Sequence, residues 1–430
     1  MINKIFSTFS IKLVSAIFNL LIAVVVSRYL GTSGKGEQSL VLTTISFILI
    51  FENIAGGAVL VYLASRFKMW VLISLSYLWS FVVGIVFYFI LLQLDIIKSD
   101  YIVAVCLLSV INSFAANNAN ILLGKEKINN YNWINFIQPV FTLMSLLVFV
   151  GFIGGTSVVS YINSLYIAYF SALVLSLIML LRLTDKKDSN INCKWKAAIK
   201  AMFAMGFYNQ LSHITSLLNM RLSYYLLEKY QDSGTLGIYS NAVSLSEAIW
   251  MVSGSMAMVQ YSKIANSEDK NYSRQLTVNM TKISLLLTII ILIPMLLLPS
   301  SFYSFVFGKD FTNINYIMIC LAPGVVFYNF ALLIGHYFSG NGEYFKNTIA
   351  SVGGLFVTLI LSFAAIPLWG YYGAALVSGF SYIVVSTVVI LFFYNETKIG
   401  FMKMLPDKKD IKRYFSEIKN FINKKHLSDE

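Results

Sequence analysis

Twelve apolar runs, joined by short polar segments, organise the chain of 430 residues. Most runs approach the roughly 20 residues that an α-helix needs to cross the hydrocarbon core of a bilayer. We therefore expect an all-α integral membrane protein with about twelve transmembrane helices. The expected helices comprise residues 8–30, 38–63, 69–94, 100–123, 131–153, 157–182, 197–226, 236–262, 277–299, 314–339, 345–368 and 370–394.

The turn after the first apolar run has a counterpart in the second half of the chain. Gly31, Gly34 and Gly36 lie close together, which favours a tight turn between two spans over a continuous helix. Gly237 lies 201 residues after Gly36 in a similar segment between two apolar runs. Similar turns in corresponding places indicate a transporter built from a repeat, with two six-helix lobes.

Three segments carry a resemblance to a known family. They are Ser27–Leu40 ("SRYLGTSGKGEQSL"), Thr235–Leu245 ("TLGIYSNAVSL") and Phe305–Ile349. On these segments the chain resembles the Wzx-type polysaccharide flippases of the multidrug/oligosaccharidyl-lipid/polysaccharide (MOP) exporter superfamily. The resemblance extends from about Ile5 to Phe393 and implies a two-lobed fold similar to that of the MATE transporters.

The resemblance also implies a function and its partners. Such a flippase would move undecaprenyl-pyrophosphate-linked oligosaccharide, the repeat unit of an O-antigen, capsule or exopolysaccharide, from the inner to the outer leaflet by alternating access. The partners would be this lipid-linked oligosaccharide, membrane lipid, a polysaccharide polymerase and a chain-length regulator. The place of action would be the bacterial cytoplasmic (inner) membrane, in the biosynthesis of lipopolysaccharide or another surface polysaccharide.

Composition supports a membrane transporter and argues against an enzyme. Charged residues make up 12% of the chain, about half the roughly 25% of a soluble domain. The three cysteines have no spacing that suggests a metal site or a disulfide. No Walker loop is present, so ATP hydrolysis within this chain is not expected. The expected cofactors are none, apart from H⁺ or Na⁺ as a coupling ion.

The charge distribution predicts the orientation of the helices. The net charge is +12, and most lysines and arginines lie in segments that would be cytoplasmic if both chain ends are inside. This asymmetry follows the positive-inside rule. Anionic lipid at the inner surface accounts for the charge, so no nucleic-acid partner is expected. The outer segments carry only Arg28, Lys35, Lys98, Lys229 and Lys309.

Polar segments divide the chain into expected regions. Residues 1–183 form an N-lobe and residues 197–394 form a C-lobe, joined by a cytoplasmic loop at 184–196. The tail, residues 395–430, is basic and cytoplasmic, with an amphipathic helix expected near residues 411–422.

Arg221 is the strongest candidate for contact with substrate. An ionisable side chain in mid-membrane costs roughly 2.5–3.5 kcal/mol on insertion scales, so it needs a partner, water or a function. The planar guanidinium pairs with phosphate through two parallel hydrogen bonds. Gln210 shares a helix face with Arg221, and Asn209 and His213 lie to one side of it. Alternatively, Arg221 pairs with Glu247 or Glu52 and holds helices together.

Glu52 and Glu247 are the candidates for ion coupling. Each carboxylate falls inside an apolar run, where it is suited to carry a proton or bind a cation. The alternative is a salt bridge or a place on a water-lined wall.

Uncharged polar stripes predict a wet interior. They include Lys12, Ser15 and Asn19 in the first helix, and Asn135, Gln138, Thr142 and Ser145 in the fifth. Each stripe should face protein or water rather than lipid, and the alternative is hydrogen bonding between helices. We therefore add Lys12, Asn19 and Gln138 to the cavity candidates. Asn118 joins them from the fourth helix, which also carries Asn112, Asn117 and Asn120.

Two other functions stay open. One is efflux of drugs or metabolites by a MATE-like relative, and the other is a membrane-embedded polysaccharide polymerase or ligase. The short outer loops argue against the enzyme, because the longest, near residues 299–313, has a single Lys-Asp pair. Flipping of a peptidoglycan precursor is less favoured, since those relatives are expected to have 14 helices.

Overall fold

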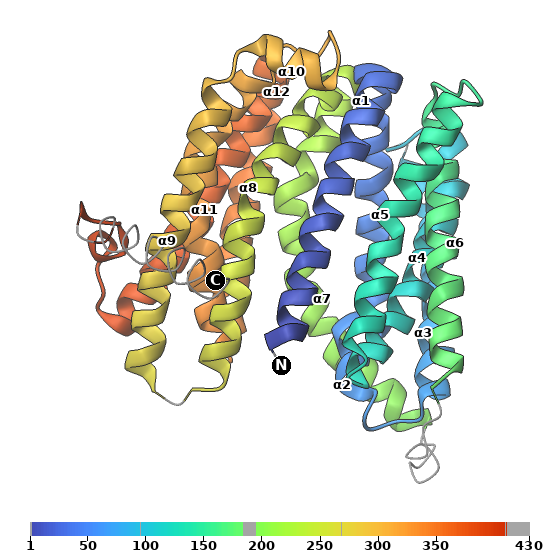
Figure 1. Cartoon of the computed structure of the whole chain (residues 1–430), viewed down its shortest axis with the longest axis horizontal. Coiled ribbons are helices and arrows are strands. Elements are labelled where there is room, and N and C mark those ends of the chain that lie inside the picture. The colour runs from blue at the N-terminus through green and yellow to red at the C-terminus, as the bar shows by residue number, and fades with distance from the viewer. Residues whose placement is uncertain (1, 95, 184–194, 268, 409, 411–430) are drawn as a thin grey trace, which may run out of the picture. The chain divides into compact units, whose positions relative to one another are not determined.

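The computed structural model describes residues 2–94, 96–183, 195–267, 269–408 and 410, without the side chains of residues 2–10, 12, 208 and 209. Nearly all described residues are helical, and none of them forms a strand (Figure 1). The expected amphipathic helix near residues 411–422 lies outside the described part. The elements are α1 (Ile2–Glu52), η1 (Asn53–Ala55), α2 (Gly57–Leu63), α3 (Met69–Leu94), α4 (Ser99–Gly124), α5 (Ile128–Gly151), α6 (Val158–Leu181), α7 (Trp195–Tyr230), α8 (Ser233–Ala265), α9 (Lys270–Leu297), α10 (Ser300–Phe307), α11 (Ile314–Gly340), α12 (Tyr344–Thr397) and η3 (Phe401–Met404).

The expected all-α membrane class is confirmed. Within the described part, nine helices are long and apolar enough to cross a membrane. Two of the nine, α1 and α12, contain 51 and 54 residues, which is far more than one span requires. Each contains one residue outside the helical region, Gly31 in α1 (φ 71°) and Gly370 in α12 (φ 53°). A positive φ is accessible to glycine at little cost, so both long helices bend there.

These two bends lie at or beside the gaps between expected spans, after residue 30 and at residues 368–370. The helix α7 coincides with the span expected at residues 197–226. It is not among the nine helices of the described part that are long and apolar enough to cross a membrane. The count of twelve spans and the membrane sides of the two ends stay predictions.

The sequence prediction is wrong about the second span, which is interrupted. We expected one helix over residues 38–63, but α1 ends at Glu52 and the chain passes through η1 before α2 begins. Gly56 has an extended backbone, and Gly57 has a φ of +57°. The Gly56-Gly57 pair therefore makes this break accessible without strain. The loop expected near residues 299–313 also contains a helix, α10.

The chain divides into two compact units, which we describe separately. Unit 1 comprises residues 1–244, 298–318 and 358–378, and unit 2 comprises residues 245–297, 319–357 and 379–430. In unit 1, α3, α4, α5 and α6 lie side by side, and α1 packs against α4 and α5 (Figure 1). The predicted lobe boundaries stay a prediction.

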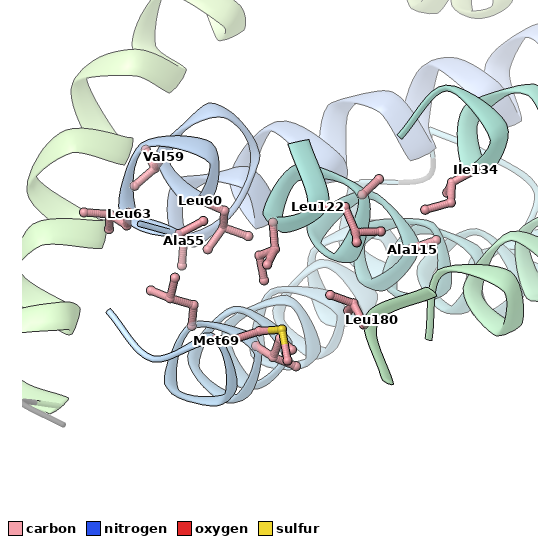
Figure 2. Packing of buried hydrophobic residues seen from close by; sticks show 14 of the residues in the cluster. Ala55, Val59, Leu60, Leu63, Met69, Ala115, Leu122, Ile134 and Leu180 are labelled. Atoms are coloured by element: carbon pink, nitrogen blue, oxygen red, sulfur yellow. The ribbon is translucent and has the colours of Figure 1, made fainter. Parts of the chain in front are cut away.

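A buried apolar cluster in unit 1 holds the interrupted segment in place. Ala55 of η1 and Leu60 of α2 are fully buried, as is Leu122 of α4, which lies near them in Figure 2. Met69 of α3 and Leu180 of α6 complete the surroundings. Burial of a leucine side chain contributes about 1.5–3 kcal/mol, so the break is a packed part of the fold.

Unit 2 has its own core and its own polar network. Phe330, Tyr337 and Phe393 are almost completely buried together with Met404 of η3. An ion pair of 2.6 Å between Lys282 Nζ and Asp410 Oδ2 attaches Asp410, which lies six residues after η3, to α9. The hydrogen bond from Lys282 holds the pKa of the Asp410 carboxyl below its usual range.

The two turn segments that resemble each other in sequence are in contact within unit 1. A β-carbon built on Gly36 would lie 1.8 Å from the carbonyl oxygen of Ser233, and one built on Gly237 would lie 2.0 Å from that of Thr32. Ser233 follows Thr32 by the same 201 residues that separate Gly237 from Gly36. Such reciprocal contacts are what a two-fold relation between the segments produces. The aligned turns predicted from sequence therefore meet in the structure.

Candidate functional site

Two basic side chains from different helices lie near each other in unit 1. Lys35 of α1 is only 4% exposed, and its Nζ donates to Oε1 of Gln38 at 2.7 Å. Arg221 of α7 is half-buried, and its Nη1 lies 3.5 Å from the hydroxyl of Tyr224. The guanidinium also lies over the ring of Tyr224, 5.1 Å from its centroid. Arg221 and Lys35 are close enough for their positive charges to repel each other.

This pair of cations favours an anionic ligand. Two like charges close together inside a protein raise each other's electrostatic energy, and a bound anion relieves the repulsion. The arginine offers a planar fork and the lysine a compact charge, a combination that suits phosphate oxygens. The sequence prediction placed Lys35 among the cations of the outer segments, and the structure adds that its side chain is buried. The glycines that place it there are visible in the sequence, whereas its burial depends on tertiary packing.

The other residues predicted on α7 have different surroundings. Gln210 is 4% exposed, and its Nε2 donates to the carbonyl oxygen of Asn53 at 3.3 Å, so it supports the break after α1. His213 is exposed on the surface of unit 1. The side chain of Asn209 lies outside the described part of the structure.

The remaining cavity candidates are divided between surface and interior. Asn19 is exposed, and the side chain of Lys12 lies outside the described part. Gln138 Nε2 of α5 donates to Asn112 Oδ1 of α4 at 3.1 Å. Asn118 is fully buried, accepts from Tyr77 and donates to Ser176, each at 2.9 Å. Asn118 therefore links α3, α4 and α6, which is the interhelical alternative for this polar stripe.

Glu52 is completely buried at the end of α1. Its Oε1 accepts a hydrogen bond of 3.2 Å from Ser109 of α4, and its Oε2 has no hydrogen-bond partner among the described residues. No ion pair of Glu52 is found in the described part of the chain. Glu52, the residue predicted for ion coupling, is thus a buried carboxyl group without a cationic partner among the described residues.

Glu247 lies in unit 2, half-buried on α8 and close enough to Tyr328 for its charge to influence that hydroxyl. Tyr328 packs against Trp250 and Tyr382 with tilted rings, whose centroids lie 4.4 Å and 5.2 Å away. Because Arg221 belongs to unit 1, its pairing with Glu247 stays a prediction.

A cavity of about 180 Å³ in unit 1 was not expected from the sequence. It is lined by two carboxylates, Glu37 of α1 and Glu228 of α7, together with Lys98 and Tyr101. Glu37 accepts from Lys98 Nζ at 2.5 Å and from the Tyr101 hydroxyl at 2.9 Å.

Within the described residues, no group of three histidine, cysteine, aspartate or glutamate side chains is placed to hold a metal ion.

Two family models match most of the chain between them. The model of the polysaccharide biosynthesis protein family matches residues 1–261, which is more than half of the chain. The chain belongs to the polysaccharide biosynthesis protein family. The model of the lipid II flippase MurJ family also matches, over residues 136–412. The sequence is therefore similar to both families, and the two matches overlap at residues 136–261.

A curated relative agrees with this assignment. The capsular polysaccharide biosynthesis protein CapF of Staphylococcus aureus is 28% identical over 203 residues. The match covers 46% of this chain and 51% of CapF, so it spans about half the length of that relative.

Solved structures show the fold that the chain shares. An inward-facing multidrug resistance MATE transporter of the MOP superfamily has a TM-score of 0.69 at 14% identity, covering 89% of this chain and 94% of that one. The lipid II flippase MurJ in an inward closed conformation has a TM-score of 0.67 at 16% identity, covering 92% and 88%. The expected membership of the MOP superfamily and the multi-pass membrane character are confirmed.

Proposed function

We propose that this polysaccharide biosynthesis protein is a flippase that moves undecaprenyl-pyrophosphate-linked oligosaccharide repeat units from the inner to the outer leaflet of the bacterial cytoplasmic membrane. Alternating access of a polar cavity would expose the sugar and phosphates first to the cytoplasm and then to the outside. The two family matches support a lipid-linked polysaccharide or a lipid II-type cargo. A polysaccharide polymerase and a chain-length regulator are further proposed partners.

The match to the polysaccharide biosynthesis protein family over residues 1–261 carries this proposal, and the repulsion between Lys35 and Arg221 in unit 1 adds to it. A pyrophosphate bears several negative charges close together, and charge-assisted hydrogen bonds to them are roughly twice as strong as neutral ones. Tyr224 lies beside the guanidinium and supports its orientation. Sugar hydroxyls would be recognised by the exposed polar candidates, Asn19 and His213.

The same cations argue against the efflux alternative. Small cationic aromatic drugs would be repelled by a site with two positive charges, because like charges in a partly buried site cost energy. The polymerase alternative has no comparable support in the described residues. We retain Glu52 and Glu247 as the proposed ion-coupling residues, with H⁺ or Na⁺ as the ion.

Ligand binding by the purified chain tests the proposal. We expect Lys35→Gln and Arg221→Gln each to weaken binding of an undecaprenyl-pyrophosphate-linked oligosaccharide about tenfold or more, because each removes a charge-assisted hydrogen bond worth about 1.5–3 kcal/mol. Lys229→Gln is the matched control, since it removes an exposed cation from the same helix, α7. Microscale thermophoresis in detergent, with inorganic pyrophosphate as competitor, provides the affinities.

Two results would contradict the proposal. One is equal affinity of the wild type and the Lys35→Gln/Arg221→Gln double variant for the lipid-linked sugar. The other is saturable binding of a cationic aromatic dye by a wild type that does not bind the lipid-linked sugar, which would favour the efflux transporter.

A further inference from the structure

The interrupted span of unit 1 brings polar atoms into the protein interior. The last carbonyl groups of a helix have no partner within the helix and must find one elsewhere. Here Trp79 of α3 donates its Nε1–H to the carbonyl oxygen of Phe51 at 2.9 Å. Gln210 of α7 donates to that of Asn53. Side chains from two other helices thus satisfy these carbonyls, and the break is a built feature of the packing.

Three side-chain oxygens beside this break have no hydrogen-bond donor among the described residues. They are Oε2 of Glu52, Oδ1 of Asn53 and Oδ1 of Asn117, and all three atoms are buried. Glu52 and Asn117 are completely buried as residues. More than nine in ten buried polar groups find a partner in native proteins, so three unpaired acceptors beside one break require an explanation.

Gly56 shows that two of these oxygens converge. A β-carbon built on Gly56 would lie 2.4 Å from Oδ1 of Asn117 and 3.1 Å from Oδ1 of Asn53. The absence of a side chain at Gly56 therefore leaves room between the two amide oxygens, and an alanine there would fill it.

Hydroxyl groups of α4 connect Asn117 to Glu52. Ser109, Ser113 and Asn117 are spaced by four residues, so they share one face of the helix. Ser109 donates to Glu52, the Ser113 hydroxyl lies beside the same carboxylate, and Asn117 Nδ2 lies 3.4 Å from Ser113 Oγ. These contacts connect the carboxylate and the amide of Asn117 through the hydroxyl groups of α4.

The chemistry of the cluster favours a small cation. An ionised carboxylate in a protein interior is costly without a compensating positive charge, and the negative end of the α1 macrodipole adds to this cost. One proton on Oε2 of Glu52 would make that atom a donor to one of the two amide oxygens and leave the other amide oxygen unsatisfied. A hard cation coordinates several oxygens together and takes carboxylate and amide ligands. A single carboxylate balances one positive charge, which favours a monovalent cation.

We propose that Glu52, Asn53 and Asn117 bind Na⁺ at the break between α1 and α2, with Gly56 leaving the space for the ion. Unwound backbone and the carboxyl ends of half-helices are suited to such ions in membrane proteins. This inference deepens the proposed flippase function, because it identifies a coupling ion. It does not depend on transport for its test.

Equilibrium binding of ²²Na⁺ to the purified full-length chain tests the site, with choline replacing sodium at constant ionic strength. We expect saturable binding by the wild type and a loss of at least tenfold in affinity for Glu52→Gln, Asn117→Ala and Gly56→Ala. Glu37→Gln is the matched control, because it removes a carboxylate from the same helix away from the break. We expect this variant to bind as the wild type does.

A folding control keeps the test decisive. Each variant should elute as a monodisperse species and unfold in choline buffer within a few degrees of the wild type. Asn53→Ala is a milder second variant, since this residue is only half-buried. We expect the wild type and the Glu37→Gln control to gain thermal stability when sodium replaces choline. The variants at the proposed site should not gain it.

Absence of saturable ²²Na⁺ binding by folded wild type would overturn the proposal, as would unchanged binding by folded Glu52→Gln. An infrared carboxyl band that titrates and disappears in Glu52→Gln, with no sodium binding, would assign the site to a proton instead. Sodium binding without any lipid-linked sugar binding would leave this site intact and refute the flippase, so the two failures are distinguishable.

Discussion

At the residue scale, the adjacent asparagines Asn117 and Asn118 of α4 have different hydrogen-bond environments. Asn118 uses both ends of its amide to join three helices, whereas Oδ1 of Asn117 is buried without a donor among the described residues. The adjacent asparagines point in different directions from α4, because consecutive helical residues lie about 100° apart around the axis. The polar stripe was visible in the sequence, but only the packing distinguishes the structural member from the ligand candidate.

Arg28 provides a residue-scale prediction about stability. In unit 1 this side chain binds the end of α10. Its Nε donates to the carbonyl oxygen of Val306 at 2.8 Å, its Nη2 donates to that of Phe305, and its guanidinium lies 5.6 Å from the centroid of the Phe305 ring. Arg28→Ala should lower the free energy of unfolding by about 1 kcal/mol, because these carbonyls lose a cationic cap.

Differential scanning fluorimetry in detergent checks this prediction. Arg28→Lys should retain part of the effect, because an ammonium group still complements a helix end. Tyr29→Ala is a control, since Tyr29 is a neighbouring exposed residue. A Tm of Arg28→Ala equal to that of wild type would show that the contact contributes nothing to stability.

The sequence identified candidate functional residues only where an ionisable side chain interrupts an apolar run. Glu52 and Arg221 stand out because an ionisable group inside an apolar run is expensive. Lys35 did not stand out, since a lysine in a glycine-rich turn is ordinarily exposed. The approach of Asn117 to Asn53 was also hidden, because 64 positions separate the two residues and they meet only through tertiary packing.

At the element scale, glycine determines where the long helices change direction. The bends at Gly31 and Gly370 coincide with expected boundaries, because turns between spans leave a local signal. The break at Gly56-Gly57 was missed, since apolar residues continue on both sides and conceal it. Hydrophobicity alone therefore predicts the extent of a span, but not whether its backbone is continuous.

The contact between the two turn segments gives an element-scale prediction. Gly237→Ala should destabilise the protein by about 1–3 kcal/mol, because the new methyl group would lie 2.0 Å from the carbonyl oxygen of Thr32 and force the segments apart. Gly254→Ala is the matched control in the same helix, α8, where a β-carbon has nothing within 4 Å. Alanine is the better helix former, so this control should be neutral or stabilised by up to about 1 kcal/mol.

Thermal unfolding in detergent distinguishes the two substitutions. The account expects a clear loss of Tm for Gly237→Ala and none for Gly254→Ala. Equal Tm values for both variants and the wild type would mean that the close approach of Gly237 to Thr32 does not occur in the folded protein.

At the scale of the whole molecule, the sequence predicted class and family better than mechanism. The apolar runs and the repeated turns predict an all-α membrane fold. Both signals extend over many residues, so an error at one boundary does not change the predicted fold class. The family matches then confirm membership of the MOP superfamily. The cargo depends on a few side chains, and their arrangement is a property of packing that no local pattern encodes.

Translocation by proteoliposomes tests the central claim most directly. The assay measures the initial rate at which a fluorescent undecaprenyl-pyrophosphate-linked oligosaccharide changes leaflet, with and without ion gradients. The account predicts transport by the wild type and by Lys229→Gln, and rates at least tenfold lower for folded Lys35→Gln and Arg221→Gln. No transport by folded wild type with any of several lipid-linked glycans would contradict the flippase, and wild-type rates in the Lys35→Gln/Arg221→Gln double variant would contradict the cationic site.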